Sequence, residues 1–267
     1  MSLKGKVALI TASTRGIGLA ISERLAKEGA TVYMAARRLD AAGQIADAMN
    51  AKGYDVHTVY FDAYDEDCFH NMVQTIVNEQ NRLDILVNNF GTSDPRKDLT
   101  ITDTPFDVFK DIVNVNLESV FRGCQEVIPV MEKNGGGSII NISSVGGLIP
   151  DISQIAYGTS KAAINYLTKE IAVQVGRKNI RCNAVLPGMT ATDAVKDNLS
   201  ENFKNMFEKN LPIKRMGTPE EMAAAVAYFA SDDAAYTTGQ ILTVGGGFGL
   251  GTPIFGDLAD SAEKQCH

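Results

Sequence analysis

The chain has 267 residues, of which 45% are hydrophobic and 21% charged, and its formal net charge at pH 7 is −7. This length suits one large α/β domain with its own core. The acidic balance and the lack of a long basic run argue against nucleic acid or an anionic membrane as a partner, so we expect a small-molecule ligand.

Cysteine usage and apolar runs suggest where the protein works. The four cysteines, Cys68, Cys124, Cys182 and Cys266, are not paired at the short intervals of metal sites or small disulfide frameworks. The apolar run at 7–10 is too short for the core of a signal peptide, and no run approaches the roughly 18 residues of a membrane span. We expect reduced thiols, no metal site and a cytoplasmic protein.

Short aliphatic or β-branched runs alternate with amphipathic helical stretches along the whole chain. This alternation is typical of repeated βαβ units around a parallel sheet. The strand runs are continuously apolar, as strands covered by helices on both faces must be. We therefore predict a single-domain, doubly wound α/β fold over residues 1–267, with three α/β/α layers.

The predicted elements follow one another in regular order. The strands are Val7–Thr11, Thr31–Ala36, Val56–Phe61, Ile85–Asn88, Ser138–Ile142, Ile180–Leu186 and Ile241–Val244, and the helices begin near Ile17, Asp40, Asp65, Phe106, Ile152 and Pro219. Thr218, Pro219 and the two acids that follow form a favourable helix N-terminus. The segment from Met189 to Leu211 is more polar and irregular than its flanks, and we expect it to act as a mobile substrate lid.

A glycine-rich turn follows the first predicted strand and leads directly into a helix. It reads Thr11-Ala12-Ser13-Thr14-Arg15-Gly16-Ile17-Gly18. Glycines let the backbone approach a pyrophosphate, and the helix N-terminus offers free N–H groups and the positive end of its dipole. The turn alone is a weak signal for a dinucleotide, because an ordinary tight turn has the same pattern.

Arg37 and Arg38 follow the second predicted strand, and Arg37 lies 19 positions after Gly18. In dinucleotide-binding folds an acid at this point binds the adenine ribose hydroxyls, whereas arginines bind a 2′-phosphate. The guanidinium group matches phosphate geometry, and Arg15 could reach the same phosphate. The pattern favours NADP(H) over NAD(H), although two solvated arginines at a strand end remain the alternative.

Tyr157, Lys161 and Ser144 form the candidate catalytic set. Tyr157 and Lys161 are four residues apart and so share one helix face, where the ammonium would lower the phenol pKa toward neutral pH. Ser144 follows a predicted strand, at the end where parallel sheets bind ligands. Ser144 would hold the substrate oxygen, Tyr157 would give or take its proton, and Lys161 would also bind the nicotinamide ribose. The alternative is a pair of capping serines and a surface tyrosine.

These motifs, in this order, resemble the short-chain dehydrogenase/reductase family along essentially the whole chain. The family's Thr-Gly-x-x-x-Gly-x-Gly turn matches residues 11–18, its Asn-Asn-x-Gly segment matches 88–91, its Tyr-x-x-x-Lys motif matches 157–161, and its Pro-Gly pair matches 187–188. The resemblance implies a Rossmann fold, NADP(H)-dependent oxidoreductase activity and a homotetramer. The tetramer would form through the long helices near Phe106 to Met131 and Ile152 to Gly176.

The resemblance also implies further site residues. Asn116 would hold a water that leads from Lys161 to solvent, although a locally satisfied helix residue is the alternative. The implied cofactor contacts are Thr11, Ser13, Thr14, Arg15, Gly16, Ile17, Gly18, Arg37, Arg38, Asp62, Ala63, Asn89, Phe90, Gly91, Tyr157, Lys161, Pro187, Gly188, Met189, Thr190 and Thr192.

Two residues depart from the family pattern. Ala12 replaces the first glycine of the turn, and a non-glycine residue there must avoid strained φ, so we expect a slightly reshaped loop. Phe90 replaces the usual alanine of Asn-Asn-Ala-Gly, and we expect its ring beside the cofactor channel. Neither change removes a catalytic group.

Several longer segments resemble more narrowly the bacterial NADP-dependent members that act on the 7α-hydroxyl group of bile acids. The segments are 61–64, 88–91, 143–153, 181–188 and 250–253. A steroid needs a long apolar trough. The candidate substrate contacts are Ser144, Gly146, Leu148, Ile149, Tyr157, Met189, Phe203 and Met206, with Leu199 and Phe207 beside them. Leu199, Phe203, Met206 and Phe207 fall at helical intervals, which more often indicates core packing.

Two other functions remain open. A 3-oxoacyl or other small-ketone reductase would use the same catalytic residues. A non-catalytic NADP-sensing protein is a different class, but it would not require Ser144, Tyr157 and Lys161 together. We therefore favour an enzyme that acts on a CH–OH group.

Overall fold

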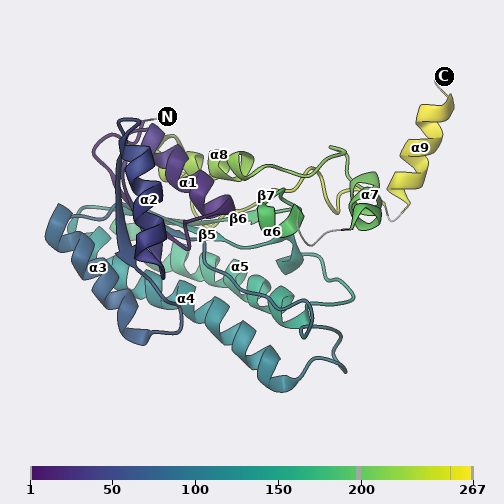
Figure 1. Ribbon diagram of the computed structural model, residues 1–267, viewed down its shortest axis with the longest axis horizontal. Helices are drawn as coiled ribbons and strands as arrows, with labels where there is room; N and C mark the ends of the chain where they lie inside the picture. Colours follow the sequence, from purple (N-terminus) through teal and green to yellow (C-terminus); the bar gives the residue numbers. More distant parts are fainter. Residues whose placement is uncertain (1, 197–199, 253, 266–267) are drawn as a thin grey trace.

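One parallel sheet forms the centre of the computed structural model, which describes residues 2–196, 200–252 and 254–265. Its strands are β1 (Val7–Thr11), β2 (Thr31–Ala36), β3 (Asp55–Tyr60), β4 (Ile85–Asn88), β5 (Gly137–Ile142), β6 (Ile180–Pro187) and β7 (Ile241–Val244). The strand order is β3-β2-β1-β4-β5-β6-β7, and each neighbouring pair is parallel (Figure 1). Because the winding reverses between β1 and β4, the predicted doubly wound sheet is confirmed.

Helices connect the strands, and most begin close to the predicted residue. They are α1 (Gly16–Lys27), α2 (Leu39–Asn50), α3 (Glu66–Gln80), α4 (Phe106–Lys133), α5 (Ile155–Val175), α6 (Asp193–Lys196), α7 (Glu201–Lys209), α8 (Pro219–Ala230) and α9 (Phe255–Gln265), with short 3₁₀ turns η1 (Val145–Gly147), η2 (Gly176–Lys178) and η3 (Asp232–Ala234). The predicted N-terminus of α8 is a full capping box, in which Thr218 and Glu221 bond each other's backbone N–H at 3.3 and 2.8 Å. Helix α5 begins three residues later than predicted.

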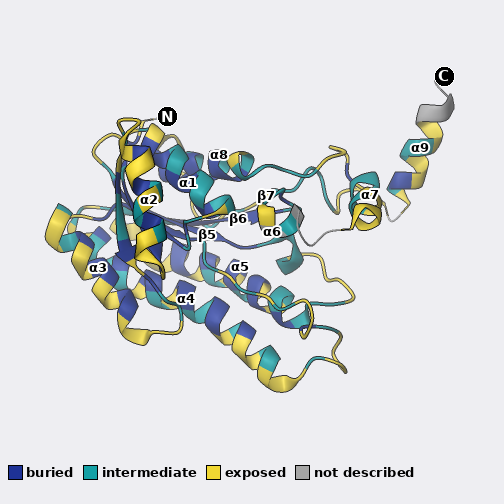
Figure 2. Cartoon of the chain, viewed as in Figure 1, coloured by how far each residue is buried: buried dark blue, intermediate teal, exposed yellow. Residues whose placement is uncertain are grey.

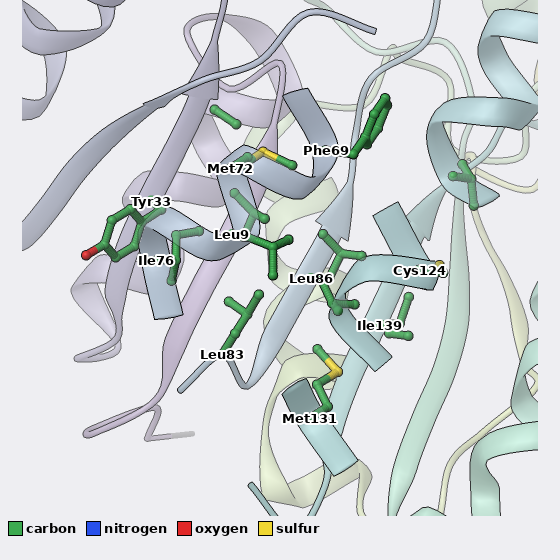
Figure 3. Close-up of a cluster of buried hydrophobic side chains, with 14 of the residues drawn as sticks. Leu9, Tyr33, Phe69, Met72, Ile76, Leu83, Leu86, Cys124, Met131 and Ile139 are labelled. Atoms are coloured by element: carbon green, nitrogen blue, oxygen red, sulfur yellow. The ribbon is translucent and has the colours of Figure 1, made fainter. Parts of the chain in front are cut away.

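Helices cover both faces of the sheet and close a separate apolar core on each face. Helices α3, α4 and α5 close one core, where Phe69 and Met131 meet Leu9 and Leu86 of the sheet (Figure 3). Helices α1, α2 and α8 close the other core. Figure 2 shows the buried residues on the helix faces that are turned toward the sheet. This arrangement is the predicted three-layer sandwich.

Helices α7 and α9 lie beyond the sheet, and α9 projects away from the rest of the protein (Figure 1). Lys209 of α7 pairs with Asp257 and Asp260 of α9, with N to O distances of 2.8 and 3.2 Å. The segment predicted as a lid, Met189 to Leu211, contains α6 and α7. Its mobility stays a prediction.

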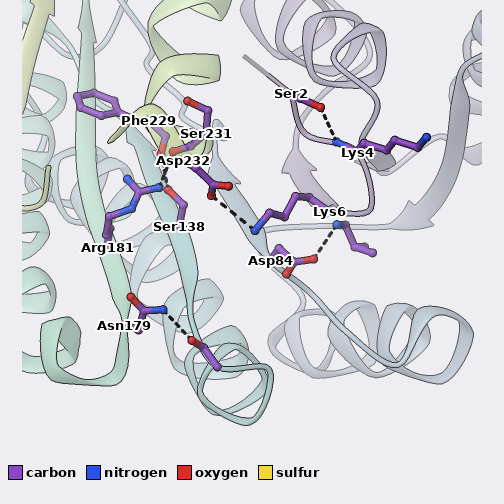
Figure 4. Close-up of polar contacts among 12 residues, drawn as sticks. Ser2, Lys4, Lys6, Asp84, Ser138, Asn179, Arg181, Phe229, Ser231 and Asp232 are labelled. Atoms are coloured by element: carbon purple, nitrogen blue, oxygen red, sulfur yellow. Dashed lines mark hydrogen bonds and ion pairs between the residues drawn. The ribbon is translucent and has the colours of Figure 1, made fainter. Parts of the chain in front are cut away.

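Polar contacts close the amino edge of the sheet, where the strands begin (Figure 4). Asp84 precedes β4, and its carboxylate accepts hydrogen bonds from the Val7 N–H at 2.8 Å and from Arg82 at 2.6 and 2.9 Å. At β5, the Ser138 hydroxyl donates to the Phe229 carbonyl at 2.8 Å. These contacts join β1, β4, β5 and α8.

Three further findings bear on the sequence expectations. Cys68, Cys124 and Cys182 are free, buried thiols, whereas Cys266 lies outside the described residues. In the part of the chain that the structure describes, no helix has the length and apolar character needed to cross a membrane. The same part holds no group of three or more His, Cys, Asp or Glu side chains that could bind a metal ion.

Candidate active site

The carboxyl ends of four neighbouring strands bring most of the predicted site residues to one edge of the sheet. These strands end at Thr11, Asn88, Ile142 and Pro187. The glycine-rich turn, the Asn-Asn-Phe-Gly segment, Ser144 and the segment at 188–192 follow directly. In open α/β sheets ligands bind outside these ends, at the point where the strand order reverses.

Tyr157 and Lys161 lie one turn apart in the first part of α5. The Lys161 Nζ atom is 5.6 Å from the centroid of the Tyr157 ring and donates a hydrogen bond to the Ile142 carbonyl at 3.0 Å. The Ser144 hydroxyl lies close enough to the Tyr157 phenol to lower its pKa. Ser144 Oγ also accepts a hydrogen bond from the Gly146 N–H at 3.1 Å. The structure thus brings the three predicted catalytic side chains together.

The pKa values in this cluster differ from the sequence expectation. Burial raises the pKa of the Tyr157 phenol above its usual value, and the nearby Ser144 hydroxyl offsets only part of that rise. Burial lowers the pKa of Lys161 to about 8, because the residue is only 3% exposed and its ammonium loses its hydration. The sequence analysis expected Lys161 to lower the Tyr157 pKa, but burial raises it, and the opposing contribution comes from Ser144.

Asn116, on the buried side of α4, connects the loop after β4 to α5. Its Oδ1 accepts a hydrogen bond from the Thr92 N–H at 2.8 Å, and its Nδ2 donates to the Thr92 carbonyl at 2.9 Å and to Ser160 Oγ at 3.0 Å. Ser160 Oγ donates to the Tyr157 carbonyl at 2.7 Å. Local partners therefore satisfy the Asn116 side chain, and its role in a proton relay stays a prediction.

The glycine-rich turn fits a phosphate-bearing ligand. A Cβ atom at Gly18 would lie only 2.5 Å from Asn89 Nδ2, which itself donates to the carbonyls of Thr11 and Ala12 at 3.1 Å. The buried Ser13 hydroxyl has no hydrogen-bond partner among the described residues. A buried polar group without a partner is rare, and this one lies where the N–H groups of α1 begin.

Ala12 adopts the backbone conformation that the sequence analysis expected it to avoid. Its φ is 53°, in the left-handed region that favours glycine. The Asn89 side chain holds the Ala12 carbonyl, so the turn keeps this geometry at a cost of about 1–2 kcal/mol. The prediction of a reshaped loop with ordinary φ at Ala12 was wrong.

Phe90 packs toward the interior. Its ring meets the Phe61 ring edge-on, with centroids 5.7 Å apart, beside the core under α3. The Phe90 and Asn89 N–H groups both donate to Thr11 Oγ1 at 3.0 Å. Phe61 offers the ring an apolar partner, and its place beside a cofactor channel stays a prediction. Next to it, Gly91 leaves room for Lys161, since a Cβ there would lie 2.9 Å from Nζ.

Arg15, Arg37 and Arg38 are exposed at the ends of β1 and β2. Within residues 2–196, 200–252 and 254–265, none of the three forms an ion pair with a carboxylate. Ala36 pairs with Tyr60 at the end of β3, so the next residue, Arg37, lies beside the segment that carries the predicted adenine contacts Asp62 and Ala63. Three guanidinium groups thus remain available to an anion at this end.

The segment after β6 is held in place by backbone contacts. The Gly188 N–H donates to the Val244 carbonyl at 3.0 Å, and the Gly217 N–H donates to the Met189 carbonyl at 3.0 Å. The Thr190 hydroxyl donates to the Gly188 carbonyl at 3.1 Å. Thr192 reaches the glycine-rich turn, because a Cβ at Gly16 would lie 3.2 Å from its methyl group.

The remaining predicted substrate contacts come from two segments. Leu148 and Ile149 follow η1, and Ile149 contacts the backbone at Gly249. Phe203 and Met206 belong to α7 and are 42% and 56% exposed. Core packing, the favoured interpretation from sequence, is therefore wrong for Phe203 and Met206.

Phe207 differs from its neighbours on α7. It is half-buried, and its ring stacks on that of Phe248, with centroids 5.1 Å apart. Leu199 lies outside the described residues. An apolar trough at this place stays a prediction.

Two surface hollows, of about 390 and 540 Å³, lie beside α4 rather than at the catalytic cluster. Tyr64, Asp107 and Asp111 line both hollows, and Ser144, Tyr157 and Lys161 line neither. We assign the chemistry to the carboxyl edge because the converging side chains, the buried lysine and the glycine-rich turn all lie there.

Asp98, in the loop after β4, was missed by sequence reasoning. Its carboxylate accepts hydrogen bonds from the N–H groups of Ala156 and Tyr157, both at 2.9 Å. The partners are 58 and 59 residues apart in the chain, so no local motif could reveal the contact.

Comparisons with known proteins agree with this geometry. The sequence profile of a family described as "Enoyl-(Acyl carrier protein) reductase" matches residues 11–249. A 7α-hydroxysteroid dehydrogenase of Clostridium sardiniense is 48% identical over 255 residues, which are 96% of this chain and 97% of that protein. A 3-oxoacyl-[acyl-carrier-protein] reductase of Chlamydia trachomatis is 36% identical, over 92% of this chain and 98% of that protein.

A solved structure is similar in fold and sequence. It is a 7α-hydroxysteroid dehydrogenase complexed with NADH and 7-oxo glycochenodeoxycholic acid, with a TM-score of 0.87 and 34% identity, covering 92% of this chain and 95% of that one. These matches span nearly the whole chain and agree with the motifs at the carboxyl edge. The chain therefore belongs to the short-chain dehydrogenase/reductase family of oxidoreductases.

Proposed function

We propose that this protein is an NADP-dependent 7α-hydroxysteroid dehydrogenase, which interconverts the 7-hydroxyl and 7-oxo groups of bile acids. The observation that carries the proposal is the convergence of Ser144, Tyr157 and Lys161 beside the glycine-rich turn. The relative that is 48% identical over nearly the full length supports the substrate class.

The residues of the carboxyl edge fit a nicotinamide dinucleotide. The Ser13 hydroxyl and the α1 N-terminus would hold the pyrophosphate, and Tyr157 and Lys161 would hold the nicotinamide ribose. The remaining contacts would come from residues 62–63, 89–91 and 187–192. When bound, the nicotinamide accepts a hydride from the substrate carbon or returns it.

The arginines favour NADP(H). Arg15, Arg37 and Arg38 are exposed, and no acid follows β2 in the position that would bind the adenine ribose hydroxyls. Guanidinium groups bind phosphate through charge-assisted hydrogen bonds, whereas a carboxylate would repel it. The related structure holds NADH, so our preference for NADP(H) rests on this chain's own residues.

The chain's own side chains would manage the substrate oxygen and its proton. Ser144 donates a hydrogen bond to that oxygen and so holds it beside Tyr157. In oxidation the hydroxyl proton passes to the Tyr157 phenolate while the C–H electron pair leaves as hydride, and in reduction the phenol returns the proton. The raised pKa of Tyr157 favours the phenol, which is the form needed for reduction. A protonated Lys161 would favour the phenolate.

A second candidate is a 3-oxoacyl reductase, which would use the same three side chains. The Chlamydia trachomatis relative supports it, but at a lower identity of 36%. The exposed apolar side chains of the predicted substrate contacts, Leu148, Phe203 and Met206, fit a bulky apolar substrate better than a short acyl chain.

We also infer a cytoplasmic homotetramer, formed through α4 and α5. Exposed Phe121, Tyr166 and Val173 on these two helices support an interface there. Residues 189–211 would close over the bound substrate.

A substrate panel tests the proposed function. Consumption or formation of NADPH would be followed by absorbance with a 7α-hydroxy bile acid, its 7-oxo product and a 3-oxoacyl thioester. We expect bile acid turnover that is at least ~10-fold more efficient with NADP⁺ than with NAD⁺. Turnover of the thioester alone would favour the general reductase. Binding of NADP(H) without turnover of either substrate class would favour a non-catalytic NADP-sensing protein.

A further inference from the structure

Helix α5 begins without a cap of its own. The residue at its cap position, Gln154, has φ 59° and ψ 44°, and its side chain makes no capping hydrogen bond. A helix start leaves several N–H groups without partners inside the helix. In α5 this first turn carries Tyr157, so its geometry matters for the proposed chemistry.

Asp98 supplies the missing partners from a distant loop. Its Oδ1 accepts from the Ala156 N–H at 2.9 Å, its Oδ2 accepts from the Tyr157 N–H at 2.9 Å, and its carbonyl accepts from the Gln154 N–H at 3.0 Å. The side chain is fully buried. A buried carboxylate is costly unless it is well bonded, and the N-terminal end of a helix dipole favours it.

The backbone of Tyr157 is therefore held on both sides. Its N–H bonds Asp98, and its carbonyl accepts from Ser160 Oγ at 2.7 Å. Ser160 in turn is bonded by Asn116, which also holds Thr92 at the start of the Asp98 loop. One loop, residues 92–98, is thus fixed to the elements that carry the candidate catalytic side chains.

Lys161 has separate anchors. Its Nζ donates to the Ile142 carbonyl at 3.0 Å, and its backbone carbonyl accepts from Ser143 Oγ at 3.1 Å. Loss of the Asp98 contacts would therefore loosen Tyr157 while Lys161 remains in place. Loss of the Asp98 contacts should therefore lower kcat more than it weakens cofactor binding.

We propose that Asp98 is a positioning residue, which sets the first turn of α5 and so aligns the Tyr157 phenol with Ser144 and the substrate oxygen. The inference rests on the proposed function for its kinetic part. It does not require Asp98 to touch substrate or cofactor.

The test compares Asp98→Ala and Asp98→Asn with Asp94→Ala and Asp94→Asn. Asp94 lies in the same loop, but it is only half-buried, and its carboxylate contacts the Arg96 N–H and Lys97 rather than α5. The measurements are kcat and KM, the NADP⁺ dissociation constant from fluorescence, and hydrogen exchange at the Ala156 and Tyr157 amides in the cofactor-free protein.

We expect Asp98→Ala to lower kcat by ~10- to 100-fold, because a displacement of about 1 Å can cost that much. The NADP⁺ dissociation constant should change much less than kcat, since Lys161 and the other proposed cofactor contacts keep their anchors. The two amides should exchange faster. Asp98→Asn keeps one acceptor and should lie between Asp98→Ala and the wild type, whereas both Asp94 variants should resemble the wild type.

Three outcomes would overturn the proposal. The first is a wild-type kcat in Asp98→Ala, and the second is unchanged exchange of the Ala156 and Tyr157 amides in that variant. The third is an equal loss of kcat and of NADP⁺ affinity in Asp98→Ala that is explained by the fraction of the variant that is unfolded. If the wild-type protein turned over no substrate of the panel, the proposed function would fail. The amide exchange would still decide whether Asp98 holds the first turn.

Discussion

The two edges of the parallel sheet differ in how their polar groups are satisfied. At the amino edge, Asp84 (Figure 4) bonds the Val7 backbone and Arg82, and its carboxylate raises the pKa of Arg82. At the carboxyl edge, burial lowers the pKa of Lys161 to about 8, and the Ser13 hydroxyl lacks a partner among the described residues.

This difference separates stability from chemistry. A satisfied polar group stabilises the fold, whereas an unsatisfied or desolvated group costs stability but can bind a ligand strongly. The amino edge therefore holds the strands together, and the carboxyl edge keeps groups ready for a ligand. Substitutions at the two edges should separate these effects.

The largest effect is expected for Tyr157→Phe. The ring and its packing remain while the transferable proton is lost, so turnover should fall by at least ~10²-fold, the usual contribution of acid–base catalysis. The free energy of unfolding and the NADP⁺ dissociation constant should stay close to the wild-type values. Steady-state kinetics measure the turnover, and chemical denaturation measures the free energy of unfolding. Normal turnover in a folded variant would show that Tyr157 takes no part in the chemistry.

The pH dependence of stability sharpens the contrast at Lys161. Its pKa is about 8 in the folded protein and 10.5 for the ordinary group, so the unfolded chain binds more protons between these values. Stability should therefore rise with pH across this window, by about 3 kcal/mol in total. Urea denaturation of the cofactor-free wild type and Lys161→Met from pH 7 to 10 isolates this contribution. A pH-independent difference between the two would contradict it.

Asp84→Ala should lower stability and leave turnover unchanged, whereas Tyr157→Phe should do the reverse. Asp84→Ala leaves the Val7 N–H and the Arg82 guanidinium without their carboxylate partner, which should lower the free energy of unfolding by about 1–3 kcal/mol. The kcat of the folded protein should not change, because the residue lies at the opposite edge. A fall in kcat without a fall in the free energy of unfolding would contradict the assignment of stability to the amino edge and chemistry to the carboxyl edge.

The smallest effect is expected for Ala12→Gly. Glycine relieves the cost of a positive φ but loses more entropy on folding, so stability should increase by about 0.5–1 kcal/mol. The control, Ala41→Gly in α2, has no such strain to relieve and should lose about 1 kcal/mol. Thermal unfolding of both variants decides this point, and destabilisation by Ala12→Gly would show that the turn is not strained.

Local sequence signals predicted most of the fold. The bounds of β1, β2, β4 and β7 agree with the predicted strands, because continuous apolar runs end at glycine or polar residues. The start of α5 was placed three residues too early, since its actual start depends on Asp98 in another loop. Helix α9 was missed for a similar reason, because its ion pairs with Lys209 are contacts distant in sequence.

The candidate site shows the same limit. Spacing predicted that Ser144, Tyr157 and Lys161 converge, because helix and strand periodicities are local properties. It did not predict the shifted pKa values of Tyr157 and Lys161, since desolvation depends on how the whole edge is packed. Nor did it predict the contact between the Phe90 and Phe61 rings, because the two residues lie in different strand connections.

The most direct test of the proposed function compares two epimers of one bile acid. Hydride leaves the substrate carbon toward the nicotinamide while Ser144 and Tyr157 hold the oxygen, so only one configuration presents both atoms correctly. With NADP⁺, the purified protein should oxidise the 7α-hydroxyl epimer and leave the 7β epimer almost untouched. Equal rates on the two epimers, or activity on acyl ketones with none on bile acids, would contradict the proposal.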